Sequence, residues 1–159
     1  MARTGYGLIE SGDDRPSLID CGAFTTPHQA PVSERLRTLY LKLVDLIALY
    51  QPTEVAIEQP FVAKNVRSAL AVGQARAVAI LAAANAGLPV YEYTPNQVKR
   101  SITNYGHSGK EQVQEMVRLQ LGLATSPQPY DAADALAIAL CHIWESRLAR
   151  LLSESEERK

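Results

Sequence analysis

Three acidic side chains, distant along the chain, are of the type and spacing that bind metal ions. Glu58 ends the short segment Val55-Ala56-Ile57-Glu58, whose alternating side chains predict a β-strand. Asp131 and Asp134 are separated by one helical turn, which places both on one face of a helix. A buried carboxylate needs a compensating partner, and Mg²⁺ prefers oxygen ligands. The pattern therefore indicates a candidate magnesium site.

Phosphodiester hydrolysis is the chemistry that such a site can perform. Two divalent cations about 3.5–4 Å apart can activate a water molecule and stabilise the leaving oxygen of a phosphodiester. Carboxylates that repel one another are tolerated where cations lie between them. A purely structural interpretation stays open: Asp131 is then the N-cap of a helix, and Asp134 is its partner in the first turn.

Positive charge is concentrated in the middle of the chain. Segment 60–110 holds six basic residues and one acidic residue, a net charge of +5, whereas the whole chain has a net charge of −1. A basic surface beside carboxylates fits a site that attracts phosphate, although a solvated helix surface explains the same composition. The basic residues are Lys64, Arg67, Arg76, Lys99, Arg100 and Lys110.

The elements that must position these side chains follow from hydrophobic periodicity and turn residues. Strands are expected at 3–10, 17–25, 55–58 and 88–93, with the first two antiparallel. Helices are expected at 31–50, 66–86, 94–101, 108–122 and 131–152. This order implies an α/β fold with helices on both faces of a sheet. The alanine-rich helix 66–86 contains Gly73, so another helix can approach it closely, within the fold or across a subunit interface.

The composition is that of one globular domain, with 47% apolar and 21% charged residues in a chain of 159. We assign 1–152 to a single domain and 153–159 to a polar, frayed tail. The chain lacks a run of about 18 apolar residues, so we expect no membrane span, and its first residues do not resemble a signal peptide. Cys21 and Cys141 are interpreted as packing thiols in a reducing cytoplasm.

Several segments occur together in the order and spacing of a known family. They are Thr4-Gly5-Tyr6-Gly7, Ala56-Ile57-Glu58-Gln59 with Phe61 and Ala63-Lys64-Asn65, Gly73-Gln74-Ala75-Arg76, Gln97-Val98-Lys99, and Asp131-Ala132-Ala133-Asp134-Ala135-Leu136-Ala137-Ile138-Ala139. In this combination, from Ala2 to about Trp144, the chain resembles the RuvC crossover junction endodeoxyribonucleases. No single segment is specific by itself.

The resemblance implies a ribonuclease-H-like mixed sheet with helices on both faces. It implies a cytoplasmic homodimer, with no membrane association, that resolves four-way (Holliday) DNA junctions by paired, symmetric nicks during recombination and repair. Glu58, Asp131 and Asp134 would be the catalytic carboxylates that bind Mg²⁺, with two ions per subunit. A branch-migration motor complex would be a further partner, and helix 66–86 would be the dimer helix.

The resemblance also assigns residues that would contact DNA. Lys99 and Lys110 match the family's basic residues near the site, where they would hold phosphate or stabilise developing charge. Phe61 matches an aromatic residue that reaches the bases at the crossover, although a core phenylalanine is the alternative. Lys64 and Arg67 flank it and are expected to contact DNA. Arg76 stays undecided between a structural and a phosphate-binding role.

One departure from the family pattern bears on activity. The family begins with a strand that ends Gly-Ile-Asp-Pro-Gly, just before the equivalent of Ala2, and this sequence lacks that strand and its aspartate. A two-metal site would lose a bridging ligand and the sheet its central strand, so we expect the chain as written to be poorly folded or inactive. A start codon assigned too far downstream is our leading explanation. The alternative functions are a non-catalytic junction-binding protein and a ribonuclease-H-fold nuclease acting on RNA.

Overall fold

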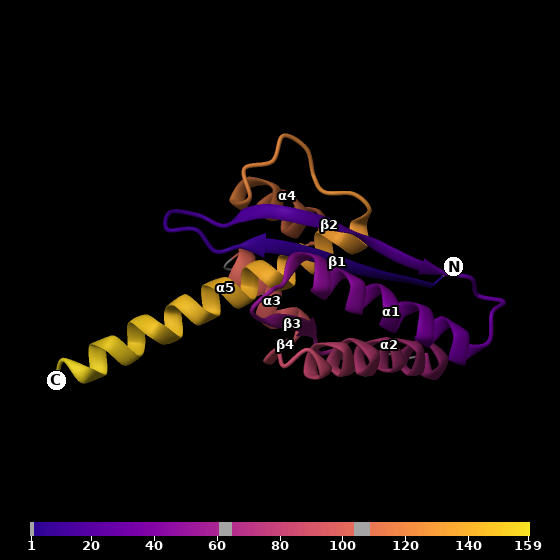
Figure 1. The fold of residues 1–159 in the computed structure, drawn as a ribbon. Coiled ribbons are helices and arrows are strands. Elements are labelled where there is room, and N and C mark those ends of the chain that lie inside the picture. The colour runs from indigo at the N-terminus through magenta and orange to yellow at the C-terminus, as the bar shows by residue number, and fades with distance from the viewer. Residues whose placement is uncertain (1, 61–64, 104–108) are drawn as a thin grey trace.

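The computed structural model describes residues 2–60, 65–103 and 109–159, and each expected element is present in it (Figure 1). Hydrophobic periodicity and turn residues therefore located the elements, and most of the differences are small shifts at their ends. In chain order the elements are β1 (Ala2–Glu10), β2 (Ser17–Thr26), α1 (Val32–Tyr50), β3 (Val55–Glu58), α2 (Val66–Asn85), β4 (Val90–Tyr93), α3 (Pro95–Thr103), α4 (Lys110–Gln120) and α5 (Tyr130–Glu157).

The strands form two pairs, one antiparallel and one parallel. β1 runs antiparallel to β2, as expected, with a register shift between Leu8 and Ile9. β3 runs parallel to β4, and Glu58 lies opposite Tyr93. The mixed pairing agrees with the predicted fold, but within the described ranges no backbone ladder joins β1 to β3. The two pairs are instead connected through a shared helix.

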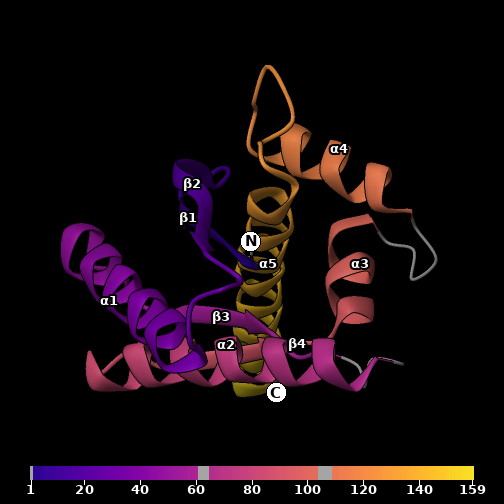
Figure 2. The same ribbon diagram turned by 90° about the vertical axis from the view of Figure 1, so that its right-hand side faces the viewer.

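That shared helix is α5, which packs on β1 and β3 and also contacts α3 and α4 (Figure 2). On the other side α1 packs on β2 and α2, while α2 packs on β3 and β4. Helices therefore cover both faces of the strands, as predicted. Most of the buried apolar cluster lies where α5 meets α3 and α4, and it includes Val98, Ile102, Val113, Val117, Leu136 and Leu140.

The two cysteines are free thiols, in agreement with the packing role expected from the sequence. Cys141 is completely buried in the cluster on α5, and desolvation is the main reason why its pKa is raised to about 11. Cys21 is half-buried, and burial, followed by the nearby charge of Asp20, raises the pKa of its thiol. Both thiols are therefore protonated and unreactive near neutral pH.

The end of α5 differs from the prediction. The helix continues through the polar segment to Glu157, and its last turns project from the body (Figure 1). Leu148, Leu151 and Leu152 are exposed on this projection. The polar tail is therefore helical rather than frayed over Ser153–Glu157, because adding residues to an existing helix costs little once the helix has been nucleated.

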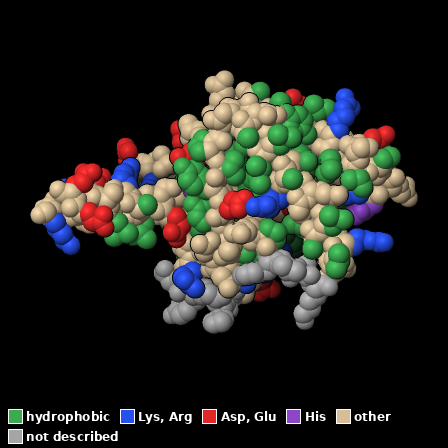
Figure 3. Space-filling model, turned by 90° about the horizontal axis from the view of Figure 1, so that it is seen from below, with side chains coloured by type: hydrophobic (Ala, Val, Ile, Leu, Met, Phe, Trp, Pro, Cys, Tyr) green, Lys and Arg blue, Asp and Glu red, His purple; other side chains and the backbone are tan. Residues whose placement is uncertain are grey.

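Helix α2 presents an apolar face that the described part of the chain leaves uncovered. Val66, Leu70, Gly73, Ala77 and Leu81 share one side of the helix, and all five are exposed. A Cβ atom added to Gly73 would meet nothing within 4 Å. Figure 3 views the molecule from the side on which α2 lies and shows hydrophobic side chains spread over it.

The ends and composition of α2 complete its description. Its N-cap is Asn65, whose side chain accepts hydrogen bonds from the backbone of Arg67 and Ser68. Gly87 follows the C-terminus with φ +72°, the left-handed conformation that glycine commonly adopts after the end of a helix. Within the described ranges α2 is long and apolar enough to cross a membrane, by length and composition only, and 11% of its apolar 18-residue window is buried. We expected no membrane span from the sequence, but the length and composition of α2 do not support that expectation.

Candidate active site

Glu58 and Asp134 come close enough to influence each other's charge. Glu58 is the last residue of β3, and α5 packs against that strand with Asp134 near its N-terminal end. Burial raises the pKa of the Glu58 carboxyl group, and the neighbouring Asp134 carboxylate raises it further. Two of the three predicted acids are therefore brought together by a strand end and a helix start, as the sequence suggested.

The start of α5 is positioned by glycine contacts with β1. A Cβ atom on Gly5 would lie 2.0 Å from the carbonyl oxygen of Asp131, and one on Gly7 would lie 2.6 Å from the side chain of Leu136. Only a residue without a side chain allows the helix this close approach. The Gly5-Tyr6-Gly7 segment therefore sets where Asp131 lies.

Asp131 does not cap the helix. The N-cap position is taken by Pro129, which makes no side-chain capping bond, and the helix begins at Tyr130. The backbone N–H groups of Ala132 and Ala133 donate to the carbonyl oxygen of Pro129. The alternative of a structural N-cap role for Asp131 is therefore wrong.

Lys110 reaches the same place from α4. Its Nζ atom lies 3.5 Å from Oδ2 of Asp134 and 5.8 Å from the centre of the Tyr130 ring. An ammonium group therefore lies beside Asp134, near the position that the family resemblance implied, and its role toward phosphate stays a prediction. Lys99 lies half-buried on α3, and within the described ranges it forms no ion pair, so its role stays a prediction.

Three residues predicted to contact DNA are less defined, whereas a fourth basic residue, Arg76, has a partner within the chain. Phe61 and Lys64 lie outside the described residues. Arg67 is exposed near the N-terminus of α2, which leaves its expected contact with DNA a prediction. Arg76 forms an ion pair with Glu92 of β4, so it has a structural partner. This pair neutralises one of the six positive charges in segment 60–110.

A divalent cation fits this site only in part. The donors are carboxylate oxygens, which suit Mg²⁺, but in the described ranges no group of three or more His, Cys, Asp or Glu side chains converges to hold a metal ion. Glu58 and Asp134 influence each other electrostatically, but in the described ranges Asp131 does not join them in a group of three ligands. Mg²⁺ commonly keeps several waters and uses one or two carboxylates plus substrate phosphates, so an open pair is compatible with it.

Sequence reasoning missed a hydrogen-bonded chain centred on the buried His142 of α5, with half-buried and exposed partners. His142 Nε2 lies 2.5 Å from Oε2 of Glu54, and its Nδ1 lies 2.6 Å from the hydroxyl of Tyr93. Tyr93 is the register partner of Glu58, so this chain ties α5 to the strand pair that carries the acid. Desolvation is the main reason why the pKa of Tyr93 is raised to about 12. The signal was a histidine on the apolar face of a helix, which needs partners when buried.

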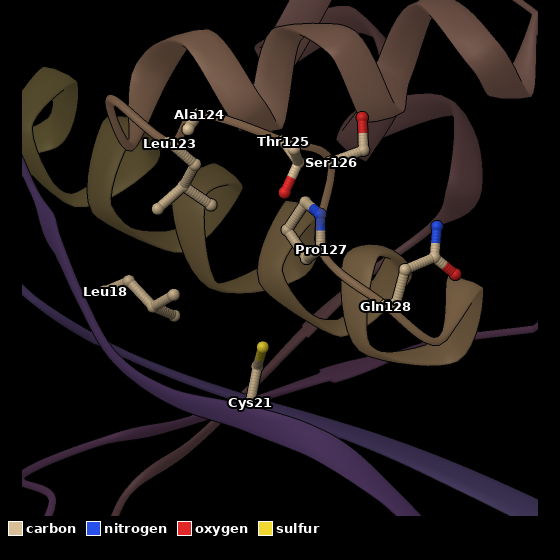
Figure 4. A pocket seen from close by; sticks show the side chains of 8 residues that line it. All are labelled: Leu18, Cys21, Leu123, Ala124, Thr125, Ser126, Pro127 and Gln128. Atoms are coloured by element: carbon tan, nitrogen blue, oxygen red, sulfur yellow. The ribbon is translucent and has the colours of Figure 1, made fainter.

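A cavity of about 340 Å³ lies elsewhere, between β2 and the segment that precedes α5 (Figure 4). It contains none of the acidic or basic residues discussed above, and it is therefore separate from the candidate site. It is lined by Leu18, Cys21, Leu123, Ala124, Thr125, Ser126, Pro127 and Gln128.

Comparison with known proteins gives one family. The family model described as "Crossover junction endodeoxyribonuclease RuvC" matches residues 1–142. The protein of that name from Dehalococcoides mccartyi is 53% identical over 152 residues, which cover 96% of this chain and 92% of that protein. The one from Chloroflexus aggregans is 54% identical over 143 residues, covering 90% and 87%.

Two solved structures of proteins with the same family name resemble this chain along nearly its whole length. "Thermus thermophilus RuvC structure" superposes with a TM-score of 0.86 at 35% identity, covering 92% of this chain and 90% of that one. "T. thermophilus RuvC in complex with Holliday junction substrate" has the same TM-score at 36% identity, covering 91% and 88%. At this identity and coverage the likeness extends through nearly the whole fold.

Proposed function

Because this chain belongs to the RuvC family of crossover junction endodeoxyribonucleases, with its ribonuclease-H-like fold, we propose that it resolves four-way DNA junctions by hydrolysing phosphodiester bonds. We further propose that it makes paired, symmetric nicks during recombination and repair. The observation that carries this proposal is the meeting of Glu58 and Asp134 beside the Lys110 ammonium group. Such a site combines groups that attract a cation with one that attracts phosphate.

The family is generally dependent on divalent metal ions, and we propose Mg²⁺ here, with two ions per subunit. Glu58, Asp131 and Asp134 would hold the metal, which would supply an activated water and stabilise the leaving oxygen. The raised pKa of Glu58 supports this assignment, because a cation would offset the desolvation of its carboxylate and then the repulsion from Asp134. Lys110 would hold the scissile phosphate, and Lys99, Lys64, Arg67 and Phe61 would contact the junction.

We propose that a second copy of the chain covers the exposed face of α2. Gly73 has no neighbour from the described part of its own chain, so the close approach that a helical glycine permits is available to another subunit. The opposite side of α2 is already occupied, since Ala82 and Ala83 are buried and Arg76 pairs with β4. A two-fold dimer would present two identical sites to a junction, which fits paired cuts.

Three further assignments rest on family membership. We propose that residues 1–152 form a single nuclease domain and that the protein works in the cytoplasm, where junction DNA arises. A branch-migration motor complex would act on the same junction. These assignments concern the domain boundaries, the cellular location and a partner of the protein, and they do not depend on the geometry of the site.

The test is cleavage of a labelled four-way junction with Mg²⁺. If the chain is active as written, it should cut two opposing strands at symmetric positions. Glu58→Gln should bind the junction with similar affinity and cut it slower by a factor of about 10² or more, because a carboxylate that holds the cation is gone. Glu154→Gln, an exposed acid on the projecting end of α5, is the matched control and should cut normally.

Each alternative predicts a different result. Tight junction binding by the unaltered chain without nicks would favour a non-catalytic junction-binding protein. Faster cutting of structured RNA than of junction DNA would favour an RNA nuclease. Retained cutting by Glu58→Gln would remove Glu58 from the site.

A further inference from the structure

An exposed aromatic ring stands beside the carboxylate site without a role in the proposed chemistry. Tyr130 is the first residue of α5 and is 57% exposed. Asp134 lies one helical turn later, so the ring and the carboxylate share a face of the helix. The Lys110 ammonium group contacts both, 5.8 Å from the ring centre and 3.5 Å from Oδ2 of Asp134.

Lys110 needs such a contact to stay in place. Its side chain is long and flexible, and an exposed ion pair restrains a lysine only weakly. A cation over an aromatic face is also attracted by the ring's quadrupole. If a divalent cation binds Asp134, that carboxylate becomes less available to Lys110, whereas the ring does not bind the cation and still holds the ammonium group.

We propose that Tyr130 is a positioning residue that holds the Lys110 ammonium group at the carboxylate site through its aromatic ring. The inference rests on the proposed function, because only a junction nuclease would give Lys110 a scissile phosphate to hold. In this inference the aromatic ring of Tyr130 holds Lys110 and the hydroxyl group does not. Phenylalanine at this position should therefore keep Lys110 in place, and leucine should not.

The contact can be observed without catalysis. Protons next to Nζ of Lys110 should show an upfield NMR shift from the ring current of Tyr130, in the protein without metal or DNA. Lys110→Met, which lacks the resonance, identifies it. The upfield shift should persist in Tyr130→Phe and disappear in Tyr130→Leu. A shift that is absent from the unaltered chain, or unchanged in Tyr130→Leu, would overturn the inference.

The functional consequence is measured as the single-turnover rate at saturating junction with Mg²⁺. Tyr130→Leu should slow cutting about 2- to 5-fold, the effect of an exposed cation–ring contact, and Tyr130→Phe should restore the rate. In a Lys110→Met background, the same change to leucine should have no further effect, because the ring acts through Lys110. Equal slowing with and without Lys110 would overturn the positioning role.

Two other outcomes are distinguishable. If Tyr130→Leu weakens junction affinity but leaves the saturated rate unchanged, the ring contacts DNA directly and the inference is wrong. If the unaltered chain does not cut at all, the proposed function fails and with it the role in cleavage. The ring-current shift would then show whether the Tyr130–Lys110 contact itself exists.

Discussion

Burial raises the pKa of the Glu58 carboxyl group, and the carboxylate of Asp134 raises it further. This arrangement makes the folded chain favour the protonated form of Glu58. The stability that this preference contributes is present at low pH, and it is lost as the pH rises through the raised pKa. Near neutral pH, therefore, ionised Glu58 weakens the fold, which is the cost expected of a carboxylate that we propose binds a cation.

A pH series of unfolding measurements tests this. Glu58→Gln should be more stable than the unaltered chain above the pKa of Glu58, because it removes the ionised carboxylate. The gain should be only about 0.5 kcal/mol, because the carboxylate, although partly desolvated, belongs to an exposed residue and water screens its charge. The difference should shrink as the pH falls below the raised pKa toward the usual glutamate value of 4.5. Urea unfolding between pH 4 and 8 measures it. A variant less stable than the unaltered chain at pH 8 would contradict the charge repulsion.

The contact between β1 and α5 is the element-scale feature on which the start of α5 depends. Gly5 lies under the backbone of Asp131, so a methyl group there must displace the helix or the strand. Gly5→Ala should therefore lower the free energy of unfolding by about 1–3 kcal/mol, the usual cost of overpacking. It should also slow cutting, because the first turn of α5 moves. Urea unfolding and the junction assay provide the measurements.

Gly109→Ala is the control for that substitution. A Cβ atom on Gly109, the N-cap of α4, would meet nothing within 4 Å, and its backbone conformation is accessible to alanine. Stability should change by a few tenths of a kcal/mol or by about 1 at most, since alanine is a poor N-cap. Equal losses in the two variants would mean that the close approach at Gly5 has no special importance.

The elements could be predicted because each rests on local signals. The apolar period of α1, the alternation of β3 and the positive φ at Gly87 are encoded within a few residues. The contacts between elements are not encoded in this way. Gly5 and Asp131 are in contact although most of the sequence separates them. Glu54 contacts His142 only because α5 packs on β3.

The site was only partly predictable for the same reason. The types and spacing of Glu58, Asp131 and Asp134 suggested metal binding, and Lys110 was expected beside them. The sequence could not show that Glu58 and Asp134 meet without a closed three-ligand group in the described ranges. It also gave no sign that Tyr130 would face Lys110, because that contact depends on how the N-termini of α4 and α5 are oriented.

At the scale of the whole molecule, the uncovered face of α2 argues for assembly. An aliphatic face of this kind on a folded chain marks an interaction surface, and its central glycine permits a close helix contact. A membrane would also cover apolar side chains, but α2 packs along the body through buried Ala82 and Ala83. A second subunit, as we propose, would cover the exposed face without removing those contacts.

Two leucines of equal exposure allow this to be tested. Leu70 on α2 is 62% exposed and Leu151 on the projecting end of α5 is 61% exposed, so a change to glutamate alters the monomer surface equally. Leu70→Glu should raise the dimer dissociation constant about 100-fold, because a charge would be buried in an apolar contact, whereas Leu151→Glu should leave it unchanged. Analytical ultracentrifugation over a concentration series measures both.

The same pair of variants connects assembly to the pattern of cutting. On a supercoiled plasmid with a cruciform junction, a dimer that nicks both strands within one binding event gives linear product. A monomer makes single nicks, which relax the plasmid and remove the junction before a second cut. Leu70→Glu should therefore shift product from linear to nicked circles while Leu151→Glu gives linear product. Linear product from a Leu70→Glu protein that sediments as a monomer would show that paired cutting does not require the α2 contact.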